Sequence, residues 1–194
     1  MSGPQVFVAS DGDPRWEQAM EGCQPMTLSS LVLTFSTLIL GEGPLVIPCA
    51  ETLLDLKHTI QAIVSTNDVI QVWAQEQKIP WVARQDDLLS VLDGGPVDYL
   101  FSIANLSLVT ASILALPRLG AINFHDGPLP RYAGLHATTW AILNRETSHG
   151  VTWHEMKETV DAGAILKQSV FALARDDTAF TLNRKCFIAG IDSF

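Results

Sequence analysis

The sequence predicts an α/β protein whose core is one doubly wound, mostly parallel sheet. Short runs rich in β-branched and aromatic residues, such as 60–64 and 99–103, alternate with segments whose apolar residues recur at helical spacing, such as 45–57. Strands that alternate with helices pair in parallel and are covered on both faces. Apolar residues make up 47% of the chain and charged residues 17%, which is typical of a well-buried domain.

Local signals place the individual elements along the chain. Strands are expected at 37–40, 60–64, 79–82, 99–103, 121–122, 151–155 and 165–172. Helices are expected at 45–57, 69–77, 86–92, 107–116, 135–144 and 178–190. We expect the last two strands to pair as a hairpin at the edge of the sheet, and Thr178 or Asp177 to cap the last helix. The predicted arrangement is a Rossmann-like sandwich.

The length of 194 residues suits one domain with a substantial core, which we place at residues 28–194. Residues 1–27 show weak periodicity and no definable apolar face, so we treat them as a leader of unknown role. Within this leader, Gln5–Ala9 is a candidate edge strand.

Charge and composition exclude several function classes. The net charge of -9 argues against a protein that binds nucleic acid through its phosphates. The longest apolar run, 28–40, is shorter than the ~20 residues that span a bilayer, and acidic residues precede it where a signal peptide is basic. The three cysteines, Cys23, Cys49 and Cys186, are far apart in sequence, so we expect reduced, buried thiols. We therefore expect a cytoplasmic protein with no nucleic-acid or membrane partner.

A Gly-x-Gly pattern follows the first expected strand, at Gly41-Glu42-Gly43. In a dinucleotide-binding fingerprint the third glycine falls where this chain has Val46, and an acidic ribose ligand stands near 65–67, where this chain has Ser-Thr-Asn. The fingerprint is incomplete, so we interpret the turn as a strand-to-helix corner and not as an NAD site.

A polar pair stands near the end of the strand that begins at Ala121. Asn123 and His125 are two residues apart, so on an extended backbone both side chains point to the same face. Ligands of open α/β sheets bind outside the carboxyl ends of strands, so polar residues there indicate a site. The amide can donate a hydrogen bond and the imidazole can move a proton near neutral pH. Alone, an Asn-x-His pair is also compatible with a strand-end cap.

Three motifs in order carry a resemblance to a known family. They are Asn-x-His, the proline-closed loop NFHDGPLPRYAG with Tyr132-x-Gly134, and the Val160-Asp161-x-Gly163 turn within HGVTWHEMKETVDAGAIL. From about Thr37 to the last residue, the chain resembles the folate-dependent 10-formyltetrahydrofolate N-formyltransferases. Its loop sequence, NFHDGPLPRYAG, is most similar to those of sugar N-formyltransferases and of formylation domains at the front of nonribosomal peptide synthetases.

The resemblance implies that Asn123, His125 and Asp161 form a catalytic trio. The implied reaction moves a formyl group from 10-formyltetrahydrofolate to an amine through a tetrahedral intermediate, without a metal. Asn123 would stabilise the oxyanion, His125 would carry the proton, and Asp161 would hold the charge state of His125 and order a water. Asp126 is a rival acid, but as the neighbour of His125 it tends to point to the other face, so we assign it to loop stabilisation.

The resemblance also points to two loops for the folate, at 102–108 and 155–161. The residues expected to contact it are Ser102, Ile103, Ala104, Asn105, Leu106, Glu155 and Val160. Trp81 and Trp153 are more typical of core aromatics. The remaining histidines near the motif, at 136, 149 and 154, lack a zinc-binding spacing, and His136 is expected to be exposed at a helix start.

Three functions remain open on the sequence. The first is an N-formyltransferase whose acceptor is an aminoacyl group on a carrier protein or an amino sugar. Because the chain stops at Phe194, it resembles the N-terminal domain of a larger biosynthetic synthetase, whose downstream domains would be partners. The second is a 10-formyltetrahydrofolate hydrolase, and the third a catalytically silent folate-binding or docking module. The family often has Asp-Thr-Gly-Asp-Ile where this chain has Asp-Ala-Gly-Ala-Ile at 161–165, which alters the surroundings of the expected acid.

Overall fold

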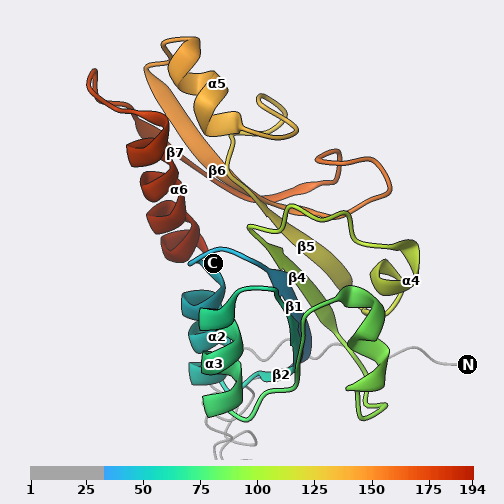
Figure 1. The fold of residues 1–194 in the computed structure, drawn as a ribbon. Coiled ribbons are helices and arrows are strands. Elements are labelled where there is room, and N and C mark those ends of the chain that lie inside the picture. Colours follow the sequence, from blue (N-terminus) through green and yellow to red (C-terminus); the bar gives the residue numbers. More distant parts are fainter. Residues whose placement is uncertain (1–32) are drawn as a thin grey trace, which may run out of the picture. The chain divides into compact units, whose positions relative to one another are not determined.

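The computed structural model describes residues 33–194 (Figure 1). The described residues contain one seven-stranded sheet in the order β3-β2-β1-β4-β5-β6-β7. Its strands are β1 (Ser36–Gly41), β2 (Thr59–Val64), β3 (Trp81–Val82), β4 (Tyr99–Ile103), β5 (Gly120–His125), β6 (Ser148–Glu155) and β7 (Ile165–Ala172). The first five are parallel, whereas β6 and β7 run antiparallel to their neighbours. The predicted leader, its candidate strand and Cys23 lie outside the described residues.

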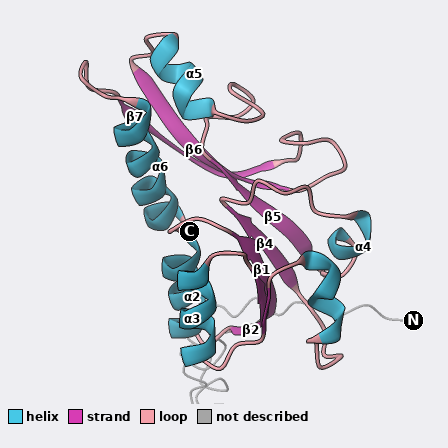
Figure 2. Cartoon of the chain, in the orientation of Figure 1, coloured by secondary structure: helices cyan, strands magenta, loops and turns pink. Residues whose placement is uncertain are grey.

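Helices cover both faces of this sheet. They are α2 (Val46–Asp55), α3 (Asp68–Glu76), the 3-10 helix η2 (Gln85–Ser90), α4 (Ala111–Leu114), α5 (Ala137–Leu143) and α6 (Ala179–Ser193). Helices α2, α3 and α6 lie along one face, and α4 lies on the other (Figures 1 and 2). The prediction of a doubly wound, mostly parallel sheet is confirmed. Among these helices, none is long and apolar enough to cross a membrane.

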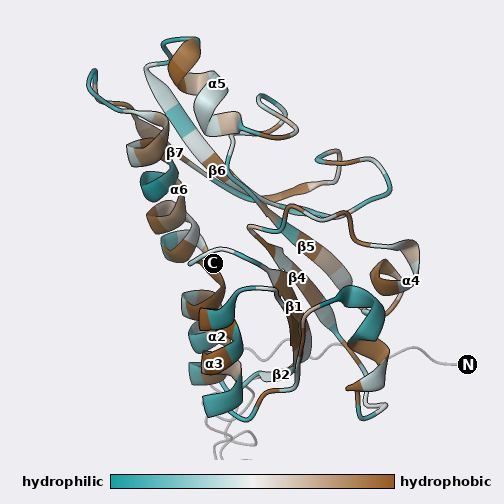
Figure 3. Cartoon of the chain, in the orientation of Figure 1, coloured by the Kyte–Doolittle hydropathy of each residue, from teal (hydrophilic) through white to brown (hydrophobic). Residues whose placement is uncertain are grey.

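Alternation along the central strands builds two core layers. In β1, Ile39 packs with α2, α3 and α6, whereas Leu38 and Leu40 pack on the other face with Leu88 of η2 and Ile113 of α4. Figure 3 shows that the central strands are predominantly hydrophobic, because both of their faces are covered. Each such fully buried leucine or isoleucine contributes roughly 1.5–3 kcal/mol. This core fixes the strands from which the functional residues project.

Several local predictions are confirmed. Strands β6 and β7 pair as an antiparallel hairpin at the sheet edge. The Thr178 hydroxyl accepts a hydrogen bond from the backbone N–H of Thr181, so Thr178 caps α6. Trp153 is a core aromatic at 4% exposure, and Trp81 packs against the same core. Cys49 and Cys186 are buried free thiols, and burial raises the pKa of Cys49 to about 12.

Other expectations were wrong. The helix expected at 107–116 shrinks to four residues, because the Gln85 side chain bonds the carbonyl of Leu108 and the N–H of Thr110 and holds this segment extended. The helix expected at 86–92 is the 3-10 helix η2. The strand expected at 121–122 runs to His125, because β6 pairs with its second half. The polar pair therefore belongs to the sheet itself.

Candidate active site

Strand pairing brings the predicted trio together at the carboxyl end of β5. Asn123 pairs with His154 across β5 and β6, and His125 pairs with Thr152. Residues two apart on one strand share a face, so Asn123 and His125 both point toward the loop that carries Asp161. The Nδ1 atom of His125 lies 3.5 Å from Oδ2 of Asp161, and each of these two side chains is 7% exposed. The structure thus places Asp161 beside His125.

Asp161 is held in the loop between β6 and β7 by two features. Its backbone has φ +54, a left-handed conformation that aspartate and asparagine tolerate better than other side chains. The backbone N–H of Gly134 donates to its Oδ2 at 2.7 Å, which ties this loop to the loop before α5. Two residues later, a Cβ on Gly163 would lie 1.8 Å from the carbonyl oxygen of Glu155, so only glycine allows this close approach.

Both ring nitrogens of His125 have partners. Its Nε2 lies 2.7 Å from the carbonyl oxygen of Tyr132, which can only accept, so Nε2 carries a hydrogen. Tyr132 presents this carbonyl from a left-handed conformation, φ +62. Nδ1 is then the nitrogen that faces Asp161 and can exchange a proton. Gly127 leaves room for the ring, because a Cβ there would lie 2.8 Å from Nε2.

His154 is a site residue that the sequence reasoning missed. It is 2% exposed, and its Nε2 lies 3.1 Å from Nδ2 of Asn123 and 3.4 Å from Oδ1 of Asp161. Its Nδ1 donates to the carbonyl of Glu155 at 2.8 Å. From the sequence, His154 was considered only as a zinc ligand, and its spacing does not suit one. The available signal was the pattern Thr152-x-His154, which on a strand antiparallel to Asn-x-His predicts a second pair on the same face.

The loop that follows His125 is anchored to the β6–β7 hairpin. The buried hydroxyl of Thr152 donates to the carbonyl of Gly127 at 2.8 Å and accepts from the N–H of Leu129 at 3.1 Å. The amide of Gln168 donates to the same hydroxyl at 2.9 Å and to the carbonyl of Leu129 at 2.8 Å. This network holds the residues after His125 independently of the trio.

His149 supports the same loop from the helix α6 side. Its Nε2 donates to the carbonyl of Asp126 at 2.8 Å, and the Cys186 thiol lies 3.8 Å from that carbonyl. The ring is 1% exposed between Tyr132 and Phe171, with ring centroids 6.0 and 6.3 Å away. Burial lowers the pKa of His149, so the buried ring favours its neutral form.

The residues predicted to contact folate lie on both sides of Asn123. Ser102, at the end of β4, pairs with Asn123, and Glu155 ends β6 on the opposite side. Ser102 and Ile103 are buried, so Ile103 offers only its main chain to a ligand. Ala104 has φ +49, and Asn105 bonds the main chain of Ser107. Leu106 is 81% exposed and Val160 is 59% exposed.

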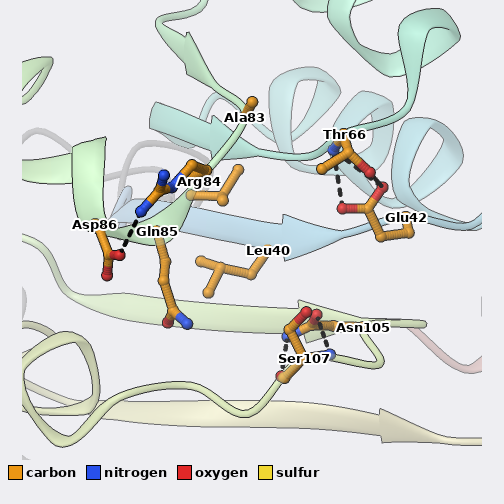
Figure 4. Close-up of a pocket in the computed structure, with 10 residues that line it drawn as sticks. Leu40, Glu42, Thr66, Ala83, Arg84, Gln85, Asp86, Asn105 and Ser107 are labelled. Atoms are coloured by element: carbon orange, nitrogen blue, oxygen red, sulfur yellow. Dashed lines mark hydrogen bonds and ion pairs between the residues drawn. The ribbon is translucent and has the colours of Figure 1, made fainter.

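A separate cavity of about 270 Å³ opens at the carboxyl ends of β1 to β4 (Figure 4). Glu42 lines this cavity, and its carboxylate accepts hydrogen bonds from the backbone N–H and the hydroxyl of Thr66. Arg84 pairs with Asp86 at 3.0 Å. The charged side chains that line the cavity are thus paired with other lining residues. Asn105, in the loop after β4, also lines it. This cavity was not predicted from the sequence. Within residues 33–194, no group of three or more His, Cys, Asp or Glu side chains is arranged to hold a metal ion.

The fold is similar to that of several solved formyltransferases. The phosphoribosylglycinamide formyltransferase of Anaplasma phagocytophilum matches 81% of this chain and 81% of its own, with 23% identity and a TM-score of 0.72. A sugar 3N-formyl transferase solved in the presence of dTDP and 5-N-formyl-THF matches 82% of this chain with 21% identity and a TM-score of 0.69. The N-formyltransferase of Helicobacter canadensis, in complex with folinic acid and dTDP-3-aminofucose, also matches 82% of this chain, with 21% identity and a TM-score of 0.69. The match spans 60% and 61% of these two sugar enzymes.

A sequence model also matches well over half of the chain. It describes a formyl transferase and covers residues 42–190, from the corner after β1 to the last turns of α6. The match includes all of the trio, His154 and both loops beside Asn123. The chain therefore belongs to the formyl transferase family.

Proposed function

We propose that this chain transfers a formyl group from 10-formyltetrahydrofolate to an amine, at the carboxyl end of β5. The observation that carries the proposal is that an amide, an imidazole and a carboxylate, from Asn123, His125 and Asp161, converge at one strand end. Formyl transfer needs a donor for the developing oxyanion and a group that moves a proton between two nitrogens. These three side chains supply both.

Each member of the trio has a distinct role. Asn123 donates from Nδ2 to the formyl oxygen, which becomes negative as the bond between the acceptor nitrogen and the formyl carbon forms. His125 takes the proton that the acceptor nitrogen loses, through Nδ1, and gives it to the folate nitrogen as the bond between that nitrogen and the formyl carbon breaks. Asp161 favours the protonated ring between these two transfers. The folate supplies the activated formyl group and the leaving nitrogen.

The two loops beside Asn123 suit a planar, partly apolar donor. Leu106 and Val160 are large apolar side chains left in solvent at 81% and 59% exposure. A bound pterin ring would cover such side chains and gain the free energy of their burial. Main-chain groups of Ser102 to Asn105 and of Glu155 would bond the ring's polar edge. Leu106 and Val160 would contribute side chains to this contact, and Ile103 only its main chain.

The proposed acceptor is an amine in one of two settings. Structural neighbours include sugar formyl transferases, which supports an amino sugar. The sequence of residues 123–134 resembles formylation domains of peptide synthetases, which supports an aminoacyl group on a carrier protein as the acceptor and a biosynthetic peptide synthetase as the larger partner.

Release of tetrahydrofolate from 10-formyltetrahydrofolate, with and without an acceptor panel, tests the proposal. The panel contains amino sugars and their nucleotide derivatives, free amino acids and aminoacyl carrier proteins. We expect release that depends on one acceptor class, with formylated product in equal amount. Asn123→Ala is expected to lower kcat by about 10²–10³-fold, the usual effect of one oxyanion donor.

Two outcomes would overturn the proposal. Release that is independent of every acceptor identifies a hydrolase, in which water replaces the amine. If the chain binds the folate but releases no tetrahydrofolate in any reaction mixture, and neither Asn123→Ala nor His125→Ala changes that binding, the chain is a silent binding module.

A further inference from the structure

We propose that His154 is a positioning residue that sets which end of the Asn123 amide is presented to the formyl oxygen. This role rests on the proposed function, because it matters only if Asn123 donates to the oxyanion. His154 touches no reacting atom in this scheme. It acts through its contact with Asn123, at 3.1 Å between Nε2 and Nδ2.

The backbone determines the tautomer of His154. The carbonyl oxygen of Glu155 lies 2.8 Å from Nδ1 and can only accept, so Nδ1 carries a hydrogen. In the neutral ring Nε2 is then a bare acceptor. The ring is 2% exposed on a paired strand, so the surrounding core prevents it from turning over. Gly163 packs directly over the Glu155 carbonyl and keeps it in place.

A bare Nε2 selects one orientation of the neighbouring amide. An asparagine side chain has a donor end and an acceptor end that occupy nearly the same space. With Nδ2 toward His154, one of its hydrogens bonds Nε2 and the other stays free for the oxyanion. The flipped amide would set Oδ1 against the Nε2 lone pair, two acceptors at hydrogen-bond distance, which is repulsive. His154 therefore keeps the donor end of Asn123 on the site.

Asp161 is the charged group that competes for Nε2. Its Oδ1 lies 3.4 Å away, farther than the amide at 3.1 Å, and its other oxygen is bonded by Gly134 and faces His125. Asn123, Asp161 and the Glu155 carbonyl are the polar groups that contact the His154 ring. The shorter of these two contacts belongs to the amide.

The tautomer is measured directly by ¹⁵N NMR of the wild-type protein labelled in its histidine rings. His154→Gln assigns the His154 signals by their loss. We expect the neutral His154 ring to carry its proton on Nδ1. A proton on Nε2 overturns the proposal, because Asn123 must then turn its oxygen toward His154. The measurement is made on the wild-type protein and does not depend on its activity. Only the assignment of the signals needs a folded variant, His154→Gln.

A double-mutant cycle tests the route through Asn123. His154→Leu removes the acceptor and is expected to lower kcat by about 10- to 10²-fold, as loss of orientation does, with KM for the formyl donor within about twofold. His154→Gln keeps an acceptor oxygen and is expected to retain more kcat than His154→Leu. In the Asn123→Ala background, His154→Leu is expected to cause no further loss. Thermal unfolding of each variant confirms that it folds.

The outcomes separate this inference from the proposed function. If Asn123→Ala lowers kcat but His154→Leu still lowers it further in that background, His154 acts on its own and the inference fails alone. If Asn123→Ala retains wild-type kcat, the oxyanion role fails, and the inference fails with it.

Discussion

Asp161 combines a charge with a backbone conformation that few residues adopt, and this restricts what can replace it. Asparagine tolerates φ +54 nearly as well and keeps an oxygen for the Gly134 N–H. Asp161→Asn therefore removes the charge beside His125 and leaves the loop folded. We expect kcat to fall by about 10²- to 10⁴-fold, the range over which positioned proton-transfer groups act, with an unchanged unfolding midpoint.

The steady-state rate of formyl transfer and the thermal midpoint check this prediction together. Asp126→Asn is the matched control, because Asp126 is the rival acid in the sequence and its carboxylate has no role in the proposed transfer. A larger loss of kcat for Asp126→Asn than for Asp161→Asn would reverse the assignment of the acid.

At the residue scale, the sequence predicted side chains that carry a recognisable motif. Asn123, His125 and Asp161 were all predicted, and the structure brings them together. His154 was missed because its role follows from the antiparallel pairing of β5 with β6, a contact between residues 31 positions apart in sequence. Ile103 was predicted as a ring neighbour, but its side chain is fully buried, because burial depends on the covering helix layer.

At the scale of elements, the β6–β7 hairpin is the support of the site. Thr152 contributes a hydroxyl that makes three hydrogen bonds in a fully buried position. Thr152→Val keeps the shape and removes all three, leaving the N–H of Leu129 and the carbonyl of Gly127 without this partner. We expect the free energy of unfolding to fall by about 1–3 kcal/mol, together with kcat.

Urea denaturation measures the loss, and an unchanged m-value shows that the fold is retained. Thr152→Ser keeps the hydroxyl and is expected to lose less than half as much stability as Thr152→Val. Equal losses in the two variants would mean that the methyl group, and not the hydroxyl network, stabilises the hairpin.

Gly163 is a second requirement of this hairpin. A Cβ there would overlap the Glu155 carbonyl, so Gly163→Ala must displace the acceptor of the His154 ring. We expect a lower thermal midpoint and a lower kcat. Gly120→Ala on β5 is the matched control, since its Cβ would meet no atom within 4 Å, and we expect it to change stability by less than about 0.5 kcal/mol. Equal effects at the two positions would contradict the argument.

Element boundaries were predicted where local chemistry decides them. The strand 99–103 and the strand 165–172 have the expected limits, and Thr178 caps α6 as one of two predicted caps. The helix expected at 107–116 was too long because Gln85, more than twenty residues upstream, holds Leu108 and Thr110 extended. A side-chain contact between residues so far apart in sequence cannot be predicted from the local sequence of the helix.

At the scale of the whole molecule, Asp98 joins three segments of the chain. Its carboxylate accepts from the N–H and hydroxyl of Ser36 in β1 and from the guanidinium of Arg118 before β5. The backbone hydrogen bond from Ser36, and then Arg118, lower the pKa of Asp98 below its ordinary value of 3.8. The ionised form therefore stabilises the fold above about pH 3.8, and this stability is lost as the pH falls through the lower folded-state pKa.

Asp98→Asn is accordingly expected to be less stable than the wild type at pH 7, with a difference that shrinks as the pH falls below about 3.8. Denaturation midpoints at constant ionic strength across this range measure it. The exposed Asp87→Asn is the control for a general effect of net charge. A difference that is independent of pH would mean that Asp98 stabilises the fold by shape alone.

The global order of strands was beyond the sequence pattern. Alternation of strands with helices predicted a mostly parallel, doubly wound sheet, which is what the structure contains. That β1 lies between β2 and β4, with the chain crossing back from β3 to β4, depends on long-range pairing that periodicity does not encode. The two core layers that this order creates are built from buried apolar residues of the strands and of the segments that cover them.

Ser102, Asn123 and His154 stand side by side on three adjacent strands. A slip of β5 by one residue would turn Asn123 and His125 to the opposite face while leaving the content of helix and strand unchanged. Catalysis is therefore an assay of strand alignment in this protein. In the wild-type chain, a refolded sample with β5 out of register is expected to keep its full circular dichroism and to lose turnover.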